Sequence, residues 1–326
     1  MTTADFYVAT DNSIHASTDE LTWQESHLLV WYDASAGIGG FHRLGHEPNT
    51  GRASSLIGIV TKHGVRYRQI QDDIELKPGH RTSTVHAAGD HHRVVTEPEL
   101  HLEVDEAEVQ LSLKIVDHHP LYKWFSATDP DGGDEDTGGA DRKLATEHYE
   151  VGGRAVGSIV LDGQKHAIDA WIVRDHSWGP RDWHLILAHR WVFANFGPGL
   201  VIPYIDLVFD GGRRIQRGMV IRDGKPQPIV DGDIVLFMES DAFTYRGASV
   251  RVRAADGFVC EFDARAVDSI ATESHGMVFS EALCTAEYEG AEGFVLVEAS
   301  NNARAGQEPV QLVLRAVTTD GLSKRS

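Results

Sequence analysis

One short segment of the chain gathers residue types that do chemistry. The stretch from Arg174 to Trp183, RDHSWGPRDW, holds two Trp, two Asp, two Arg and one His. Because alternate side chains of an extended backbone share a face, His176 and Trp178 are expected to point the same way. A titratable ring beside a large aromatic ring suits a substrate pocket. The competing interpretation is a structural corner, in which Trp178 and Trp183 fill the core and the charged residues pair locally.

Other polar and aromatic residues are expected to complete this pocket. Asp175 or Asp182 can orient His176 or hold Arg181. Several tryptophans supply aromatic surface, of which one or two can line an apolar cavity. We therefore expect the substrate to contact Trp178, Asp175, Arg181, Trp183, Arg217 and Trp191.

A second candidate lies in the strand-like stretch from Val201 to Phe209, VIPYIDLVF. Alternation places Tyr204 and Asp206 on one face among apolar neighbours. If that face is interior, burial raises the pKa of Asp206 and keeps the carboxyl group protonated, so that it can protonate an alkene carbon. Tyr204 can then hydrogen-bond Asp206 or the substrate.

An ordinary ion pair is the alternative for the same carboxyl group. If Gly211 and Gly212 form a two-residue turn, Asp206 lies across from Arg217 on the next strand. Such a pair lowers the pKa of Asp206 and removes the argument for an acid. The sequence leaves both interpretations open.

Familiar cofactor and metal motifs are absent from the sequence. It contains no HExxH, CxxC, GxSxG, Walker A or GxGxxG pattern, and the glycines from Gly37 to Gly40 lie in a strand-like context that favours a turn. We therefore expect neither a metal nor a cofactor. A weaker hypothesis is a metal-assisted enzyme that uses His176 with other histidines. Residues 126–140, SATDPDGGDEDTGGA, favour a solvated acidic loop over an EF-hand, because Ala140 stands where a bidentate Glu would be needed.

Short β runs separated by Gly and Asp turns dominate the chain, and sustained helical periodicity is nearly absent. This predicts an all-β protein with few short helices and antiparallel sheets that close into a barrel or stack as a sandwich. We expect two consecutive β domains, residues 1–186 and 187–326, with the acidic loop in the first. The expected hairpins join 100–104 to 108–116, 154–161 to 166–174, 201–209 to 214–222, 249–254 to 258–264, and 285–288 to 294–299.

Composition restricts the partners and the location. The formal net charge of -19 disfavours nucleic acid and anionic membrane surfaces. No apolar stretch is long enough to span a membrane and the N-terminus lacks signal-peptide character, so we expect a cytoplasmic protein. The two cysteines, Cys260 and Cys284, are expected to be reduced core thiols. The oligomeric state, monomer or homodimer, stays open.

Together the two candidate segments resemble a known family. The pattern Asp-His-x-Trp-Gly from Asp175 to Gly179, followed by Tyr204 and Asp206, is similar to that of the carotenoid 1,2-hydratases and the wider AttH-like group, whose shape fungal Diels-Alderases share. The resemblance implies two consecutive lipocalin-like β domains with a hydrophobic pocket. It also implies that residues matching His176, Trp178, Tyr204 and Asp206 are tied to activity, with the aspartate as the acid.

These observations lead to two functional hypotheses. The first is a cofactor-independent lyase or isomerase that acts by proton transfer on a terpenoid or aromatic small molecule, through hydration, dehydration, carbon–carbon cleavage or cyclisation. Asp206 would be the acid or base, and His176 and Tyr204 its partners. The second is a lipocalin-like carrier of a hydrophobic small molecule without catalysis. Polar neighbours such as Arg174 and Arg190 favour a substrate shorter or more oxygenated than a carotenoid.

Overall fold

The structure is a computed structural model that describes residues 12–96, 99–126, 145–209, 214–240, 244–274, 277–302 and 320–324. It divides into two compact units. The first comprises Met1–Ile59, His63–Asp182 and Asp320–Ser326, and the second comprises Val60–Lys62 and Trp183–Thr319. The expected acidic loop lies outside the described residues, apart from its first position.

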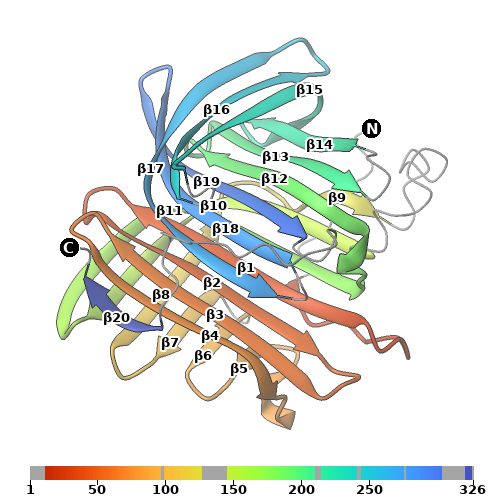
Figure 1. Cartoon of the computed structure of the whole chain (residues 1–326), viewed down its shortest axis with the longest axis vertical. Helices are drawn as coiled ribbons and strands as arrows, with labels where there is room; N and C mark the ends of the chain where they lie inside the picture. Colours follow the sequence, from red (N-terminus) through yellow and green to blue (C-terminus); the bar gives the residue numbers. More distant parts are fainter. Residues whose placement is uncertain are drawn as a thin grey trace. The chain divides into compact units, whose positions relative to one another are not determined.

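The first unit is built on one 12-stranded sheet, in the order β20-β4-β3-β2-β1-β11-β10-β8-β7-β6-β5, with β9 paired to β10 (Figure 1). A short 3-10 helix, η2 (Pro78–His80), precedes β5. The strands are β1 (Trp23–Asp33), β2 (Ile38–Glu47), β3 (Arg52–Thr61), β4 (Val65–Glu75), β5 (Val85–Ala88), β6 (His92–Val95), β7 (His101–Asp105), β8 (Val109–Asp117), β9 (Tyr122–Ser126), β10 (Glu147–Leu161), β11 (Gln164–Pro180) and β20 (Gly321–Lys324).

This sheet curls so that strands far apart in its order meet across one face. Nε2 of His46 on β2 donates a hydrogen bond to the carbonyl oxygen of Ala87 on β5, at 2.8 Å. The rings of His27 on β1 and His86 on β5 also hydrogen-bond, at 3.0 Å. Alternate residues of the strands therefore face a shared interior, which is mostly apolar.

The second unit is a closed antiparallel barrel in the order β12 to β19. Its interior is filled by side chains, among them Tyr204 and the buried thiols Cys260 and Cys284, which are free as expected. A 3-10 helix, η4 (Trp183–Leu185), precedes the barrel. The strands are β12 (Ile186–Asn195), β13 (Leu200–Phe209), β14 (Arg214–Arg222), β15 (Lys225–Met238), β16 (Tyr245–Ala254), β17 (Val259–Ser274), β18 (Met277–Tyr288) and β19 (Ala291–Asn302).

Local turn chemistry explains why the expected hairpins form. At the end of β10, Asp162 and Gly163 adopt φ of 51° and 70°, the left-handed conformation that a two-residue hairpin turn requires. Leu161 then pairs with Gln164, and the hairpin continues along both strands. All five predicted hairpins are confirmed by the strand pairings.

The all-β prediction is confirmed, since the described residues hold strands and short 3-10 helices. One difference concerns the C-terminus. Strand β20 pairs with β4 in the sheet of the first unit, whereas the sequence analysis placed all of 187–326 in one domain. Among the described residues, we find no helix that is both long and apolar enough to cross a membrane.

Candidate functional site

Strand register assembles a polar cluster on the inner face of the first unit's sheet. His27 on β1 lies directly opposite His176 on β11, and His176 lies opposite Tyr149 on β10. In the next row, Glu25 lies opposite Trp178. Because directly opposite residues of antiparallel strands project to the same face, these five side chains form one patch.

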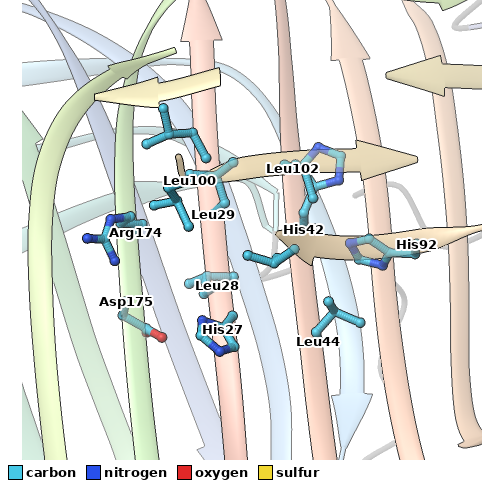
Figure 2. A pocket seen from close by; sticks show the side chains of 12 residues that line it. His27, Leu28, Leu29, His42, Leu44, His92, Leu100, Leu102, Arg174 and Asp175 are labelled. Carbon is cyan, nitrogen blue, oxygen red and sulfur yellow. The ribbon is translucent and has the colours of Figure 1, made fainter. Parts of the chain in front are cut away.

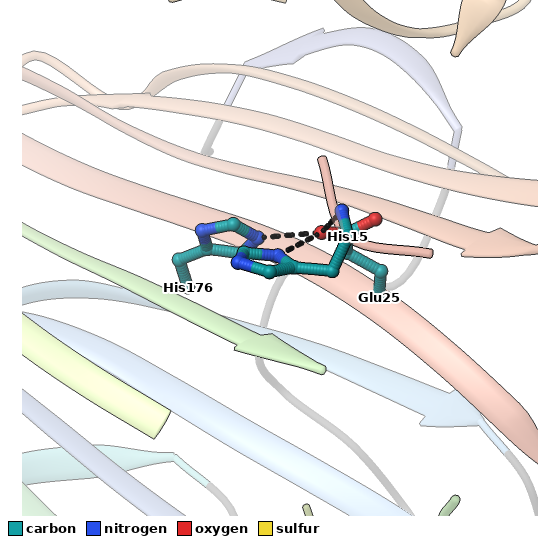
Figure 3. Close-up of side chains that lie close together, drawn as sticks. All are labelled: His15, Glu25 and His176. Atoms are coloured by element: carbon teal, nitrogen blue, oxygen red, sulfur yellow. Dashed lines mark hydrogen bonds and ion pairs between the residues drawn. The ribbon is translucent and has the colours of Figure 1, made fainter. Parts of the chain in front are cut away.

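Glu25 is the centre of this patch. Its side chain is fully buried, and its Oε1 accepts hydrogen bonds from Nδ1 of His15 at 2.8 Å, the backbone N–H of His15 at 3.0 Å and Nε2 of His176 at 3.1 Å. Figure 3 shows both rings directed at this carboxylate. Arg81 contacts the other oxygen at 2.9 Å. Burial by itself would raise the pKa of Glu25, but the hydrogen bonds from His15 and His176 hold it well below its usual range.

His176 connects the carboxylate to a phenol. Its ring has no exposed surface, and its Nδ1 lies 3.2 Å from the hydroxyl group of Tyr149. That hydroxyl also donates to Oδ1 of Asn12 at 2.8 Å and accepts from Nη1 of Arg174 at 3.3 Å. The result is a continuous chain of proton-carrying groups: carboxylate, imidazole and phenol.

Charge in the cluster is balanced by ion pairs. Arg174 holds Asp117 through two hydrogen bonds of 2.8 and 2.5 Å, and Arg81 faces Glu25. Burial alone would lower the pKa of Arg174, but Asp117 and Tyr149 raise it above its usual value. Both guanidinium charges are thus matched by carboxylates, and no imidazolium is needed for neutrality.

Trp178 supplies the aromatic wall of the patch. The ring of His15 stacks on it with centroids 3.6 Å apart and an angle of 5°, and the ring of His176 lies at 4.9 Å. Trp178 also packs with Tyr149 in a small apolar cluster. An electron-rich indole face in this position can stabilise a cation.

His27 of the patch and two histidines beside the patch, His86 and His46, are neutral rings. His27 stacks on His176 with centroids 3.9 Å apart. Burial lowers the pKa of His27 and of His86 well below the usual value, with a further contribution from His176 in both cases. Burial also lowers the pKa of His46 to about 4. At neutral pH these rings are therefore uncharged hydrogen-bonding groups.

A pocket borders the cluster at His27 and Arg174 (Figure 2). Its empty volume is about 350 Å³, part of which is open to solvent. Two more histidines, His42 and His92, also line it. The apolar wall includes Leu29, Leu44, Val94, Leu100, Leu102 and Ile115.

His15, Glu25 and His176 form the one group of potential metal ligands found among the described residues. One donor atom from each lies within 4.8 Å of the others. Two imidazole nitrogens with a carboxylate oxygen suit a divalent transition metal that keeps open coordination positions. The patch can thus work either through hydrogen bonds alone or around a bound ion.

The structure brings only part of the sequence-predicted site into this patch. His176 and Trp178 belong to it. Asp175 alternates to the other face of β11 from His176, and it is one of the residues that line the pocket in Figure 2. Arg181 lies outside the patch and donates to the hydroxyl oxygen of Ser26 at 3.1 Å. In the second unit, Trp183 packs edge-on against Phe279, with centroids 5.9 Å apart.

The remaining predicted residues belong to the barrel. Tyr204 has no exposed surface and donates its hydroxyl to the carbonyl oxygen of Gly232 at 2.8 Å. Asp206 is buried and ion-paired, but its partner is Arg214, through hydrogen bonds of 2.7 and 2.5 Å. The predicted pair with Arg217 is wrong, because Arg217 lies opposite Ile205 and therefore projects to the other face.

Trp191 on β12 lies opposite Ile205 on β13 and is buried. It projects away from Val192 and Ala194, which belong to the barrel core. Its burial is consistent with either of the roles that the sequence analysis considered, a core residue or a cavity wall.

Glu25, His27 and Tyr149 were not predicted as site residues from the sequence. A signal was present in β1, WQESHLLVWYD, where Glu25 and His27 alternate in phase with Trp23, Leu29 and Trp31. Polar residues on an otherwise apolar face indicate a buried polar site.

Comparison with known proteins places the chain in a family. The model named "Domain of unknown function (DUF7064)" matches residues 9–303. No curated protein matches. A putative AttH from Nitrosomonas europaea has a similar structure, with a TM-score of 0.67, 10% identity, and coverage of 93% of this chain and 98% of that chain.

Two other solved structures share the fold. CghA has a TM-score of 0.60 at 12% identity, covering 88% of this chain and 90% of that one. Kievitone hydratase from Nectria haematococca has a TM-score of 0.57 at 9% identity, covering 87% and 90%. The predicted resemblance to AttH-like proteins is confirmed in fold. Since the family model spans nearly the whole length, the chain belongs to the DUF7064 family.

Proposed function

We propose that this chain is a lyase or isomerase that acts on an apolar small molecule by proton transfer, without a redox cofactor. The observation that carries the proposal is the buried chain of Glu25, His176 and Tyr149, which lies beside a pocket. Each member can hold or pass a proton, and the surrounding protein excludes water.

The hydrogen bonds give each group a distinct task. The carboxylate of Glu25 accepts from Nε2 of His176, which leaves Nδ1 as the basic nitrogen directed at Tyr149. When the phenol gives its proton to a substrate carbon, Arg174 stabilises the phenolate that forms. When the phenol takes a proton, its own proton turns from Oδ1 of Asn12 to Nδ1 of His176, which receives it. One chain therefore serves both halves of a hydration, dehydration or isomerisation.

A protonated double bond leaves a carbocation that the site must stabilise. The indole of Trp178 lies against both His176 and Tyr149 and has the electron-rich face for this task. Addition of water to the cation completes a hydration, whereas loss of a neighbouring proton completes an isomerisation. The same residues therefore serve both reactions.

The names of two structural neighbours support a small-molecule substrate. One is a kievitone hydratase, and CghA was crystallised with Sch210972. At identities of 9% and 14% these similarities show a shared fold alone. The chemistry proposed for this chain therefore rests on its own residues.

The role of Asp206 as the acid, with His176 and Tyr204 as partners, is a separate proposal taken from the family resemblance. The ion pair with Arg214 weighs against it, because the guanidinium group already occupies both carboxylate oxygens of Asp206. The hydroxyl of Tyr204 is likewise bound to the backbone of Gly232. A direct comparison of variants separates the two assignments.

The test is label incorporation by the full-length protein. Kievitone, prenylated phenols and monoterpenoid alkenes are incubated in ¹⁸O-labelled water and in D₂O, and products are read by mass spectrometry. We expect Glu25→Gln and Tyr149→Phe to lose about 10²-fold or more in rate, and Asp206→Asn to retain its rate. Circular dichroism confirms that each variant is folded.

Two results would contradict the proposal. Full activity in both Glu25→Gln and Tyr149→Phe would remove the chain from the mechanism, and a loss confined to Asp206→Asn would favour the family-based acid. Ligand binding without label incorporation in any compound would favour the alternative of a lipocalin-like carrier.

A metal-assisted reaction at the same residues is the second candidate. The donor atoms of His15, Glu25 and His176 favour it because they already lie within 4.8 Å of one another. A bound ion would activate water for addition to the substrate. Elemental analysis of the purified protein measures its metal content. A bound metal that is lost in His15→Ala would favour this candidate over proton transfer through Tyr149.

A further inference from the structure

We propose that the pocket lined by His42 and His92 recognises the oxygen atom of a neutral alcohol, phenol or ketone, so that the substrate carries such a group on an apolar body. This inference rests on the proposed function, since it treats the pocket as the binding site for the part of the substrate remote from the reacting carbon. It names a substrate class that the Glu25–His176–Tyr149 chain does not specify.

The first recognition group is the Nδ1–H of His42. The indole N–H of Trp31 donates to Nε2 of His42 at 3.0 Å, and burial keeps the ring neutral by lowering its pKa well below the usual value. The single ring proton must therefore be on Nδ1. That nitrogen is buried and has no hydrogen-bond partner in the described part of the chain.

A glycine makes this arrangement possible. A Cβ atom at Gly40 would lie 2.6 Å from Nε2 of His42 and 2.7 Å from Nε1 of Trp31. Any larger residue would push the two rings apart and break the hydrogen bond from Trp31 that fixes the tautomer of His42. The glycine on β2 thus fixes a hydrogen-bond donor at the pocket wall.

The second recognition group is the ring of His92 on β6. Burial lowers its pKa to about 3, so the ring is neutral and has one donor and one acceptor nitrogen. Neither nitrogen has a partner among the residues that the structure describes. The ring lies edge-on to His42, with centroids 5.9 Å apart. A hydroxyl or carbonyl oxygen near both rings would satisfy groups that are otherwise costly to bury.

The other pocket walls select a neutral, apolar body. Figure 2 shows Arg174 on the side away from His92, and its charge is matched by Asp117. Since both histidines are neutral as well, no unmatched positive charge faces the pocket to attract a carboxylate or phosphate. Leucine side chains form much of the remaining wall. Part of the empty volume of about 350 Å³ is open to solvent, so the enclosed space is small and suits only a compact ligand group.

The test compares small molecules that share a skeleton and differ in oxygen. Thymol, menthone, p-cymene and 4-isopropylbenzoate are titrated into the full-length protein by calorimetry. We expect thymol to bind at least about 10-fold more tightly than p-cymene, menthone to bind more tightly than p-cymene, and 4-isopropylbenzoate to bind most weakly.

His92→Phe is the informative variant. Phenylalanine keeps the ring shape and removes both unpartnered nitrogens, so the protein should fold while the preference for thymol over p-cymene falls several-fold. His118→Phe, a half-buried ring of the same unit that does not line the pocket, is the matched control and should keep the preference. Nitrogen-15 spectra of the histidine rings should show shifts at His42 and His92 when thymol is added.

Three results would overturn the inference: equal affinity for thymol and p-cymene, unchanged preference in His92→Phe, or no measurable binding of thymol and menthone. The outcome is independent of catalysis. Glu25→Gln should keep the thymol preference, so a protein that prefers thymol but never incorporates label would refute the proposed function and leave the binding class in place.

Discussion

Lowering the pH from 7 to 5 should destabilise the wild-type protein more than a His92→Phe variant, because folding buries the ring of His92 completely. The pKa of this ring falls from 6.5 to about 3 on folding. The unfolded chain therefore binds this proton more readily than the folded protein. The free energy of unfolding is unaffected above pH 6.5 and decreases as the pH falls from 6.5 toward 3.

The size of the effect follows from the width of that interval. One pKa unit corresponds to about 1.4 kcal/mol, and pH 5 lies about 1.5 units below the unfolded pKa of His92. Burial of this ring should therefore lower the free energy of unfolding by about 2 kcal/mol at pH 5 relative to pH 7. Other buried histidines, such as His27, His46 and His86, shift in the same direction and add to the wild-type slope. The difference in this slope between wild type and His92→Phe gives the contribution of His92 to the pH dependence of stability.

The assay is urea-induced unfolding at pH 7 and pH 5, followed by tryptophan fluorescence and far-UV circular dichroism. Leu102→Ala is the control, because removing a fully buried apolar side chain should lower the free energy of unfolding equally at both pH values. Identical pH dependence in wild type and His92→Phe would refute the assignment of His92 as a buried neutral ring.

Three further predictions concern two closely packed glycines and one ion pair. Gly232→Ala should lower the free energy of unfolding by about 1–3 kcal/mol, since a Cβ there would lie 2.7 Å from Cζ of Tyr204; thermal melting measures this. Asp206→Asn should cost only about 1 kcal/mol, because its partner Arg214 is half exposed; a larger loss in urea unfolding would contradict a simple ion pair. Gly157→Ala should prevent β10 from pairing normally with β8, since its Cβ would meet a backbone carbonyl oxygen, and amide exchange along both strands should accelerate.

The sequence alone determined the fold class and the hairpins, because these depend on neighbours along the chain. A turn such as Asp162-Gly163 adopts its left-handed conformation from local preferences, and alternation along each strand then follows from backbone geometry. The pairing of His176 and Trp178 on one face was predicted for the same reason, and the resemblance in fold followed from the segment that contains them.

Tertiary structure decided which side chains meet. Glu25 and His176 are 151 residues apart in the chain, and their contact exists because β1 pairs with β11 in one particular register. A shift of one residue would direct the whole set to the other face, so neither partner could be identified from its own strand. The partner of Asp206 was missed for a related reason, since the pairing of β13 with β14 placed Arg217 on the opposite face and left Arg214 in reach.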